Sequence, residues 1–289
     1  MLLAANLGAM IFIIVSMVTL GLSTTVPQVI APLKDKNLMS RAILANFILV
    51  PVLAYLLVTG LHLPAGIAIG LILVGTAAGS PFLARANQIH ADKRELAGGL
   101  GVLLTILSVF YIPVIAPNLV PGESKIDPVY LFITFVIIII IPLFIAMYLR
   151  PGREEKVARV LPWLDRTSYG AFFATFIGVL FVFFTQQTTI IGYGGLLAII
   201  LFVIAAFGIG YLLGGYAPHM RAVLSFGTAQ RGLSVALVFP LLSLLAYEIN
   251  PGSYVYDPTV LLMIVSLGIA SLIILMVLGK RLAKQGIPG

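Results

Sequence analysis

The sequence predicts an all-helical polytopic membrane protein, and its composition is the first observation that supports this fold class. Of the 289 residues, 61% are hydrophobic and only 9% are charged, and the mean hydropathy is +1.14. An ordinary globular chain is about 45–50% apolar and about 25% charged. So few charges cannot cover a water-facing surface, and most of the surface is therefore expected to face lipid.

The second observation is the length of the apolar runs. Nine runs approach or exceed the 20 or so residues that a helix needs to cross the hydrocarbon. They cover residues 2–24, 41–60, 64–85, 95–117, 128–149, 168–186, 192–214, 219–247 and 256–279. Runs this long and this continuously apolar exclude barrel strands and indicate a helical bundle. The first run lacks a basic leader, since the first Lys is Lys34, so we expect a span rather than a cleaved signal peptide.

The third observation is that Lys and Arg residues fall in alternate loops. The loops on one side hold only Lys125, whereas fifteen of the 17 Lys and Arg residues lie on the other side. Those fifteen occupy the loops at 25–41, 85–94, 150–167 and 215–221 and the C-terminal tail. This asymmetry predicts an N-terminus outside the cell and a C-terminus in the cytoplasm. Basic residues spread between apolar runs, rather than on one face, also argue against nucleic acid as a partner.

The chain is predicted to consist of two halves. The first half covers 1–150 with five spans and the second covers 168–289 with four, joined by a cytoplasmic interfacial helix within 151–167. Gly75-Thr76-Ala77 in span three and Gly227-Thr228-Ala229 in span eight lie 152 residues apart. Because span eight follows span three by five spans, the two copies would run in opposite directions, as an inverted repeat.

The two Gly-Thr-Ala motifs predict a helix break in the middle of each of these spans. Breaks free backbone groups that lipid cannot satisfy, so they are tolerated where they line a cavity or bind something. We therefore expect residues 75–81 and 227–232 to be non-helical and close together near the bilayer midplane, at a transport site. The alternative is that these small residues only allow close helix packing.

Arg231 is the one clear charge predicted inside a span, because all ten acidic residues fall in loops or at helix ends. A charge within the membrane is costly and indicates a functional site, and Arg231 beside Thr228 and Gln230 would attract an anion. The alternative is a structural role in capping freed carbonyls. The absence of acidic residues from the spans argues against a proton pump.

Three further polar residues are candidate ligands. Asn46 lies five residues before Pro51 in span two, and Thr105 and Ser108 precede Pro113 in span four. The alternatives are a helix–helix hydrogen bond for Asn46 and a bond to the carbonyl four residues earlier for each hydroxyl. The three His residues lack metal-ligand spacing, and the spans lack a nucleophile–base pair, so we expect neither a metal site nor an enzyme.

The order of these motifs resembles that of the bile acid:sodium symporter family over nearly the whole chain. The resemblance rests on 17–22 (MVTLGL), Pro27, 46–51 (NFILVP) and the two expected breaks at 75–85 and 227–237. It implies a core domain of spans two, three, four, seven, eight and nine, in which two broken helices cross. It also implies a panel domain of spans one, five and six, with substrate bound in the crevice between the domains.

The two broken helices depart from the pattern of the sodium-coupled members. Those members carry Ser-Asn in the first, and Glu followed four residues later by Gln in the second. Here the first reads Ala77-Ala78, and the nearest hydroxyl is that of Ser80. In the second, alignment on the shared Thr places Gly227 at the Glu position and Arg231 at the Gln position. A shift of one residue places Phe226 and Gln230 there instead, and the Glu is missing in both cases.

The resemblance also implies that part of a sodium site remains. Asn46 matches a family amide that helps to bind one sodium ion, and Thr105 and Ser108 lie near its hydroxyl ligands. Na⁺ is therefore a candidate cofactor, although an Arg at the site would repel it. We predict that Arg231 takes the place of the bound sodium ion as the positive charge of the core.

The function predicted from the sequence is secondary transport of organic anions, bile-acid-like or smaller carboxylates, by alternating access. Its expected partners are the lipid bilayer and the transported anion, and sodium coupling is left open. The alternative is an uncoupled channel or facilitator for small anions. The predicted site comprises Asn46, Gly75, Thr76, Ala77, Ser80, Thr105, Ser108, Gly227, Thr228, Gln230 and Arg231.

Overall fold

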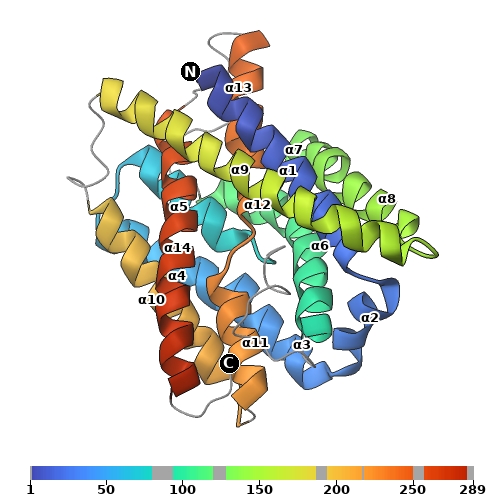
Figure 1. Cartoon of the computed structure of the whole chain (residues 1–289). Helices are drawn as coiled ribbons and strands as arrows, with labels where there is room; N and C mark the ends of the chain where they lie inside the picture. Colours follow the sequence, from blue (N-terminus) through green and yellow to red (C-terminus); the bar gives the residue numbers. More distant parts are fainter. Residues whose placement is uncertain are drawn as a thin grey trace.

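Helices make up the described part of the computed structural model, and no strand occurs there (Figure 1). The described residues are 2–79, 94–119, 128–186, 194–216, 218–249 and 257–284. In chain order the elements are α1 (Leu2–Ser23), α2 (Val26–Lys34), α3 (Lys36–Ile43), η1 (Leu44–Leu49), α4 (Val50–Gly60), α5 (Ala65–Thr76), α6 (Arg94–Leu119), α7 (Pro128–Phe135), η4 (Val136–Ile140), α8 (Ile141–Leu149), α9 (Glu154–Gln186), α10 (Gly195–Leu213), α11 (Pro218–Ala229), α12 (Leu233–Ala236), α13 (Val238–Ile249) and α14 (Pro258–Lys284). The elements η1 and η4 are π-helical.

Seven stretches of the described residues are long and apolar enough to cross a membrane. They are Asn6–Ser23, Lys36–Gly60, Glu95–Ile115, Pro128–Leu149, Gly195–Leu213, Met220–Ser243 and Pro258–Gly279. Each matches one of the predicted runs, and the protein is an integral membrane protein. Of the other two runs, the third contains the shorter apolar helix α5 and the sixth forms the C-terminal part of α9. The total of nine spans stays a prediction.

The predicted linker and the sixth run form a single helix, α9, of 33 residues. The linker is thus helical from Glu154, but it continues without a break into the sixth run, and its position at the membrane interface stays a prediction. Pro162 lies inside α9 and leaves the carbonyl of Ala158 without its helical donor. Ala158 is exposed, so water can bind that carbonyl and the helix need not end there. At about 1.5 Å per residue α9 is about 50 Å long, more than the hydrocarbon thickness of about 30 Å.

The three spans assigned to the panel domain, spans one, five and six, pack together. The helices α1 and α9 lie side by side (Figure 1), with the hydroxyls of Ser16 and Ser168 2.8 Å apart. The rings of Phe12 and Phe172 extend this contact, with centroids 5.2 Å apart. On another face of α1, Gly21 permits close approach to α8, because a Cβ atom there would overlap the carbonyl of Leu143. The division into core and panel domains stays a prediction.

The remaining helices surround the ends of α5 and α11. The helix α5 contacts α4, α6 and α14, and α10 contacts α4, α11 and α14. In Figure 1 the helices α4, α5, α10 and α14 lie together on the left, and α6 stands on the right. The C-terminal ends of α5 and α11 are therefore enclosed by protein rather than by lipid.

Residues near the ends of spans that are predicted on the same side of the membrane contact each other. At one end, the Arg41 guanidinium donates from Nη1 to the carbonyl of Leu213, the last residue of α10, at 3.4 Å. At the other end, a Cβ atom on Gly66 would overlap Asp257. These contacts agree with the alternation deduced from the Lys and Arg residues, whereas the side that each end faces stays a prediction.

Candidate functional site

The C-terminal ends of two helices, one from each half of the chain, meet in the middle of the bundle. The helix α5 ends at Thr76 and is followed by the non-helical residues 77–79. The helix α11 ends at Ala229, and the non-helical residues 230–232 separate it from α12. The N–H of Gly232 donates to the carbonyl of Ala77 at 3.0 Å. The two non-helical segments therefore cross in direct contact, as expected from the paired motifs.

The first break begins two residues later than predicted, because Gly75 and Thr76 still belong to α5, and residues 80 and 81 lie outside the described residues. The helix α5 ends where the next backbone N–H and its helical acceptor bond other residues instead of each other. The N–H of Ala78 bonds the hydroxyl of Ser108 at 2.8 Å, while the carbonyl of Val74, its normal helical acceptor, accepts from Nε of Arg231 at 3.1 Å. Interactions with other elements, rather than the Gly-Thr-Ala motif itself, thus set the end of α5.

The second break is shorter than predicted, since Gly227 and Thr228 lie in the last turn of α11. The same exchange occurs here. The N–H of Gly232 leaves its normal acceptor, the carbonyl of Thr228, and bonds Ala77 instead. The vacated carbonyl of Thr228 accepts from Nη1 of Arg231 at 3.3 Å. A Gly inside a helix costs only about 1 kcal/mol relative to Ala, so Gly227 did not have to break the helix.

Glycine is required at two positions of the crossing. A Cβ atom on Gly232 would lie 2.5 Å from the carbonyl oxygen of Gly79 and 2.9 Å from that of Ala78. Gly79 has φ +81°, and a Cβ atom there would overlap Thr105 on α6. Both neighbours at Gly232 are backbone atoms, which cannot move aside as a side chain can.

Arg231 lies at the centre of the crossing, only 2% exposed. Nε bonds the carbonyl of Val74, and Nη2 bonds the carbonyls of Gly75 at 2.7 Å and Asn46 at 3.4 Å. Nη1 bonds Oδ1 of Asn46 at 2.5 Å and the carbonyl of Thr228. These five acceptors equal the five N–H donors of a guanidinium group, and all five are neutral oxygens.

Helix dipoles compensate the charge of Arg231. The carbonyls of Val74 and Gly75 lie in the last turn of α5, and the carbonyl of Thr228 lies in the last turn of α11. The C-terminal end of a helix carries a partial charge of about −0.5, so two such ends roughly balance one guanidinium. This arrangement allows a charge in the membrane interior that otherwise costs about 2.5–3.5 kcal/mol on insertion scales.

Pro51 explains why two backbone carbonyls of the second span can accept hydrogen bonds from side chains of other elements. The N–H of Val50 bonds the carbonyl of Ala45 in the π-helix η1, and Pro51 has no N–H to continue the pattern. The next two carbonyls, of Asn46 and Phe47, consequently lack helical donors. The first accepts from Arg231, and the second accepts from the hydroxyl of Tyr111 on α6 at 2.6 Å.

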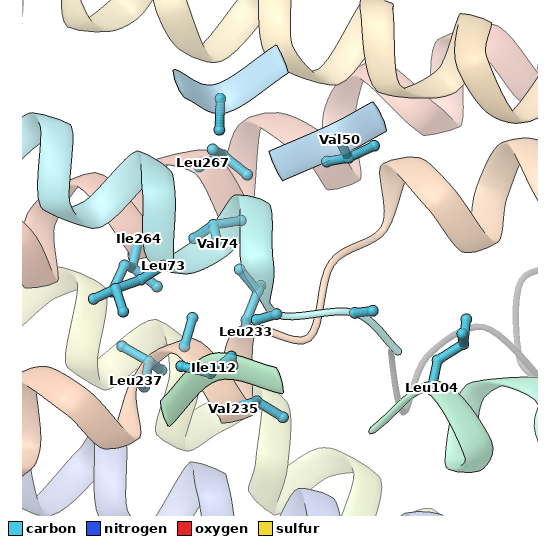
Figure 2. Close-up of a cluster of buried hydrophobic side chains, with 14 of the residues drawn as sticks. Val50, Leu73, Val74, Leu104, Ile112, Leu233, Val235, Leu237, Ile264 and Leu267 are labelled. Carbon is cyan, nitrogen blue, oxygen red and sulfur yellow. The ribbon is translucent and has the colours of Figure 1, made fainter. Parts of the chain in front are cut away.

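Apolar side chains enclose the crossing. Figure 2 shows Val74 on α5, Ile112 on α6, Leu233 on α12 and Leu267 on α14 around the two non-helical segments. All four belong to one buried cluster. A low-dielectric surrounding strengthens the bonds to Arg231 and makes any buried polar atom without a partner costly.

Three buried polar atoms flank the second break without a hydrogen-bond partner in the described part of the chain. They are Oγ1 of Thr228, Oε1 of Gln230 and Oγ of Ser234. The hydroxyls belong to residues with no exposed surface, and Gln230 is 8% exposed. Leaving such a group unsatisfied costs about 1–3 kcal/mol, so three of them within seven residues indicate a place that binds water or a solute.

The crossing brings most, but not all, of the predicted side chains together. Its contacts involve Asn46, Gly75, Ala77, Ser108, Thr228 and Arg231. Thr76 and Thr105 instead bond carbonyls of their own helices, at Ile72 and Gly101. Gln230 lies in the second break, Gly227 is buried in α11, and Ser80 lies outside the described residues.

The sequence reasoning missed Tyr111, Ser234 and the carbonyl of Val74. Tyr111 was detectable in principle, because Pro51 frees a carbonyl that needs a donor from a neighbouring helix. Ser234 was detectable as a hydroxyl just after a break in an apolar run. The role of the Val74 carbonyl had no sequence signal, since every residue has a carbonyl.

Apolar spanning helices with paired interruptions that meet inside the bundle are typical of secondary transporters. The chain belongs to the sodium bile acid symporter family, whose profile matches residues 10–213. The chain is also similar to YocS of Bacillus subtilis (strain 168), which is described as an uncharacterized sodium-dependent transporter. The two are 28% identical over 214 residues, which cover 68% of this chain and 62% of YocS, less than two thirds of that relative. The second break lies beyond the part matched to the family profile.

Proposed function

We propose that this protein is a secondary transporter that carries a small organic anion across the membrane by alternating access. The observation that carries the proposal is the crossing itself. Two interrupted helices meet there, around a buried positive charge and three buried polar atoms that have no partner in the described residues. Membership of a symporter family supports the same function.

The charge at the crossing supports an anionic substrate. All five acceptors of Arg231 are neutral oxygens, so the guanidinium has no acidic partner and its charge is offset only by the dipoles of two helix ends. Because the donors of Arg231 are already used, the substrate is attracted through space rather than by a direct salt bridge. Two opposite charges about 8 Å apart attract by about 2 kcal/mol at an effective dielectric of about 20, and the negative ends of the two helices reduce this attraction.

The unpartnered atoms near the second break supply the direct contacts. The hydroxyls of Thr228 and Ser234 can donate to a carboxylate, and Oε1 of Gln230 can accept from a hydroxyl on the substrate. A substrate bound there would satisfy groups that otherwise cost several kcal/mol. We therefore place the substrate beside 228–234, with Arg231 behind it.

An inverted repeat supports alternating access. The contact between Ser16 and Ser168 joins residues 152 positions apart, the same offset that separates the two Gly-Thr-Ala motifs. If a symmetry axis relates the two copies, residues at equivalent positions can touch each other only where they lie beside that axis. The helices α5 and α11, which precede the two breaks, are each 12 residues long. Two such copies can rock against each other around a shared site.

The experiment is uptake by the purified protein in liposomes. Radiolabelled glycocholate and radiolabelled pyruvate serve as a large and a small carboxylate. Uptake should exceed that of protein-free liposomes for one of them, and Ser234→Ala should lower it about tenfold, as expected for one lost hydrogen bond of about 1.4 kcal/mol. Ser225→Ala is the matched control, because its buried hydroxyl bonds only the carbonyl of Arg221 in its own helix.

Two outcomes would overturn the proposal. Transport of a neutral or cationic solute with no transport of either carboxylate would show that the anion assignment is wrong. Equal loss of uptake in Ser234→Ala and Ser225→Ala would show that the unpartnered hydroxyl has no special role.

An uncoupled facilitator is the second candidate function. The fixed charge of Arg231 favours it over a sodium-coupled transporter. Exchange kinetics separate a carrier from a channel. A carrier takes up labelled substrate faster when unlabelled substrate is loaded inside the liposome, whereas a channel does not.

A further inference from the structure

Five oxygens from three parts of the chain face a single point at the crossing. They are the carbonyls of Val74, Gly75, Asn46 and Thr228 and Oδ1 of Asn46. Neutral carbonyl and amide oxygens are hard donors, the kind that bind small cations. Two of the three parts are C-terminal ends of interrupted helices, which in broken-helix transporters coordinate a small cation. The crossing thus has the donor set of a cation site.

We infer that Arg231 is a built-in cation that occupies this site, so that the crossing assembles without a dissociable monovalent cation, and that truncation of Arg231 opens a site for Na⁺. The guanidinium takes the place of the ion, and its covalent tether to the second break keeps it there. The inference rests on the proposed function, because it concerns whether transport at the same crossing is coupled to sodium.

Saturation of the guanidinium is the first argument. Each of its N–H donors has an oxygen partner between 2.5 and 3.4 Å away. Those oxygens cannot at the same time coordinate Na⁺, and the positive charge would repel it.

Position is the second argument. Arg231 lies in the second break, and its acceptors lie in the first interrupted helix, in η1 and in α11. A cation at this point neutralises both helix ends and holds the two breaks together. A sodium ion would do this only while it is bound, whereas Arg231 does it permanently. Solute movement by this protein is therefore expected to be independent of a sodium gradient.

The test compares thermal unfolding of the full-length protein in detergent, in NaCl and in choline chloride of equal ionic strength. The wild-type melting temperature should be the same in both salts. Arg231→Ala should melt lower in choline chloride and recover by about 5 °C or more in NaCl, because a ligand that binds only the folded state stabilises it. Millimolar guanidinium chloride, which supplies the missing group, should also restore stability.

Arg221→Ala is the matched control. Arg221 lies on α11 as well, but its guanidinium bonds the carbonyl of Gly215 and the hydroxyl of Tyr211, away from the crossing. Its melting temperature should show no recovery that is specific to sodium or guanidinium. Binding of ²²Na⁺ provides a direct readout: none above background for the wild type, and saturable binding for Arg231→Ala that is lost in Asn46→Ala/Arg231→Ala.

Several results would overturn the inference. One is a wild-type protein that is stabilised by NaCl over choline chloride or that binds ²²Na⁺. Another is an Arg231→Ala variant that folds but responds to neither cation. If that variant does not fold, Arg231→Lys and Arg231→Gln replace it, and only the uncharged Gln variant should respond to sodium. Unfolding is measured without transport, so a failure of glycocholate and pyruvate uptake would contradict the proposed function while leaving this inference standing.

Discussion

Nη1 of Arg231 donates to Oδ1 of Asn46 at 2.5 Å, across a separation of 185 residues in the chain. The bond joins the two halves of the chain, because Asn46 belongs to η1 in the first half and Arg231 to the break in the second. Asn46 also anchors its own amide by donating from Nδ2 to the carbonyl of Ala42 at 3.0 Å. The bond to Ala42 therefore holds the amide of Asn46 with Oδ1 directed at Arg231.

Asn46→Ala should destabilise the protein by about 2–3 kcal/mol, because it removes a charge-assisted bond and leaves one N–H of Arg231 buried without a partner. The measurement is the melting temperature of the purified protein in detergent. Asn118→Ala is the control, since Asn118 also donates from Nδ2 to the carbonyl four residues earlier but is exposed. Equal melting temperatures for the two variants would contradict the role given to Asn46.

Gly232→Ala should prevent the two breaks from crossing, because the added Cβ atom meets the backbone carbonyls of Gly79 and Ala78. We expect a strongly lowered melting temperature and loss of solute uptake. Gly208→Ala in α10 is the matched control, with nothing within 4 Å of its Cβ atom. It should leave stability unchanged or raise it by up to about 1 kcal/mol, the helix preference of Ala over Gly. A Gly232→Ala variant with normal stability and uptake would refute the close contact.

Ser108→Ala should cost about 1–3 kcal/mol, because the buried N–H of Ala78 loses its acceptor. The control is Ser271→Ala, whose buried hydroxyl bonds only the carbonyl of Gly268 in its own helix. Melting temperatures again provide the comparison. The prediction fails if removal of the Ser271 hydroxyl costs as much as removal of the Ser108 hydroxyl.

Tyr111→Phe should cost about 1–2 kcal/mol in the wild type, because the carbonyl of Phe47 loses its donor. The cost should fall when Pro51 is replaced by alanine, since alanine at this position has an N–H that can bond the freed carbonyls. A double-mutant cycle of stability over Tyr111→Phe and Pro51→Ala should therefore give a coupling of about 0.5 kcal/mol or more. Strict additivity would show that the two residues act independently.

Labelling of introduced cysteines tests the orientation, and the absence of native Cys makes each label unambiguous. Glu123→Cys, in a loop predicted to lie outside the cell, should react with an impermeant maleimide on intact cells. Lys156→Cys, near the start of α9, should react only in inverted vesicles. Reaction of both from the same side would show that the predicted topology is wrong.

The helical class, the membrane location and the approximate places of the breaks were predictable from the sequence. These features depend on local composition: a run of about 20 apolar residues selects a spanning helix in lipid. Arg231 was recognisable for the same reason, since a charge among apolar residues needs a partner wherever the chain folds. The family resemblance, confirmed by the match over residues 10–213, added the expectation that the two breaks cross.

Only the tertiary structure decided how the groups at the crossing are paired. Thr76 and Ser108 both looked like site hydroxyls, yet the first bonds only its own helix, whereas the second bonds Ala78 as well as the carbonyl of Leu104 in its own helix. Successive residues of a helix point about 100° apart, so the rotation of each helix against its neighbours decides which hydroxyl faces the crossing. The ends of α5 and α11 are decided in the same way, because other residues take the place of helical partners: Arg231 and Ser108 at α5, and Arg231 and Ala77 at α11. Such pairings between residues far apart in the chain depend on packing, which local sequence does not specify.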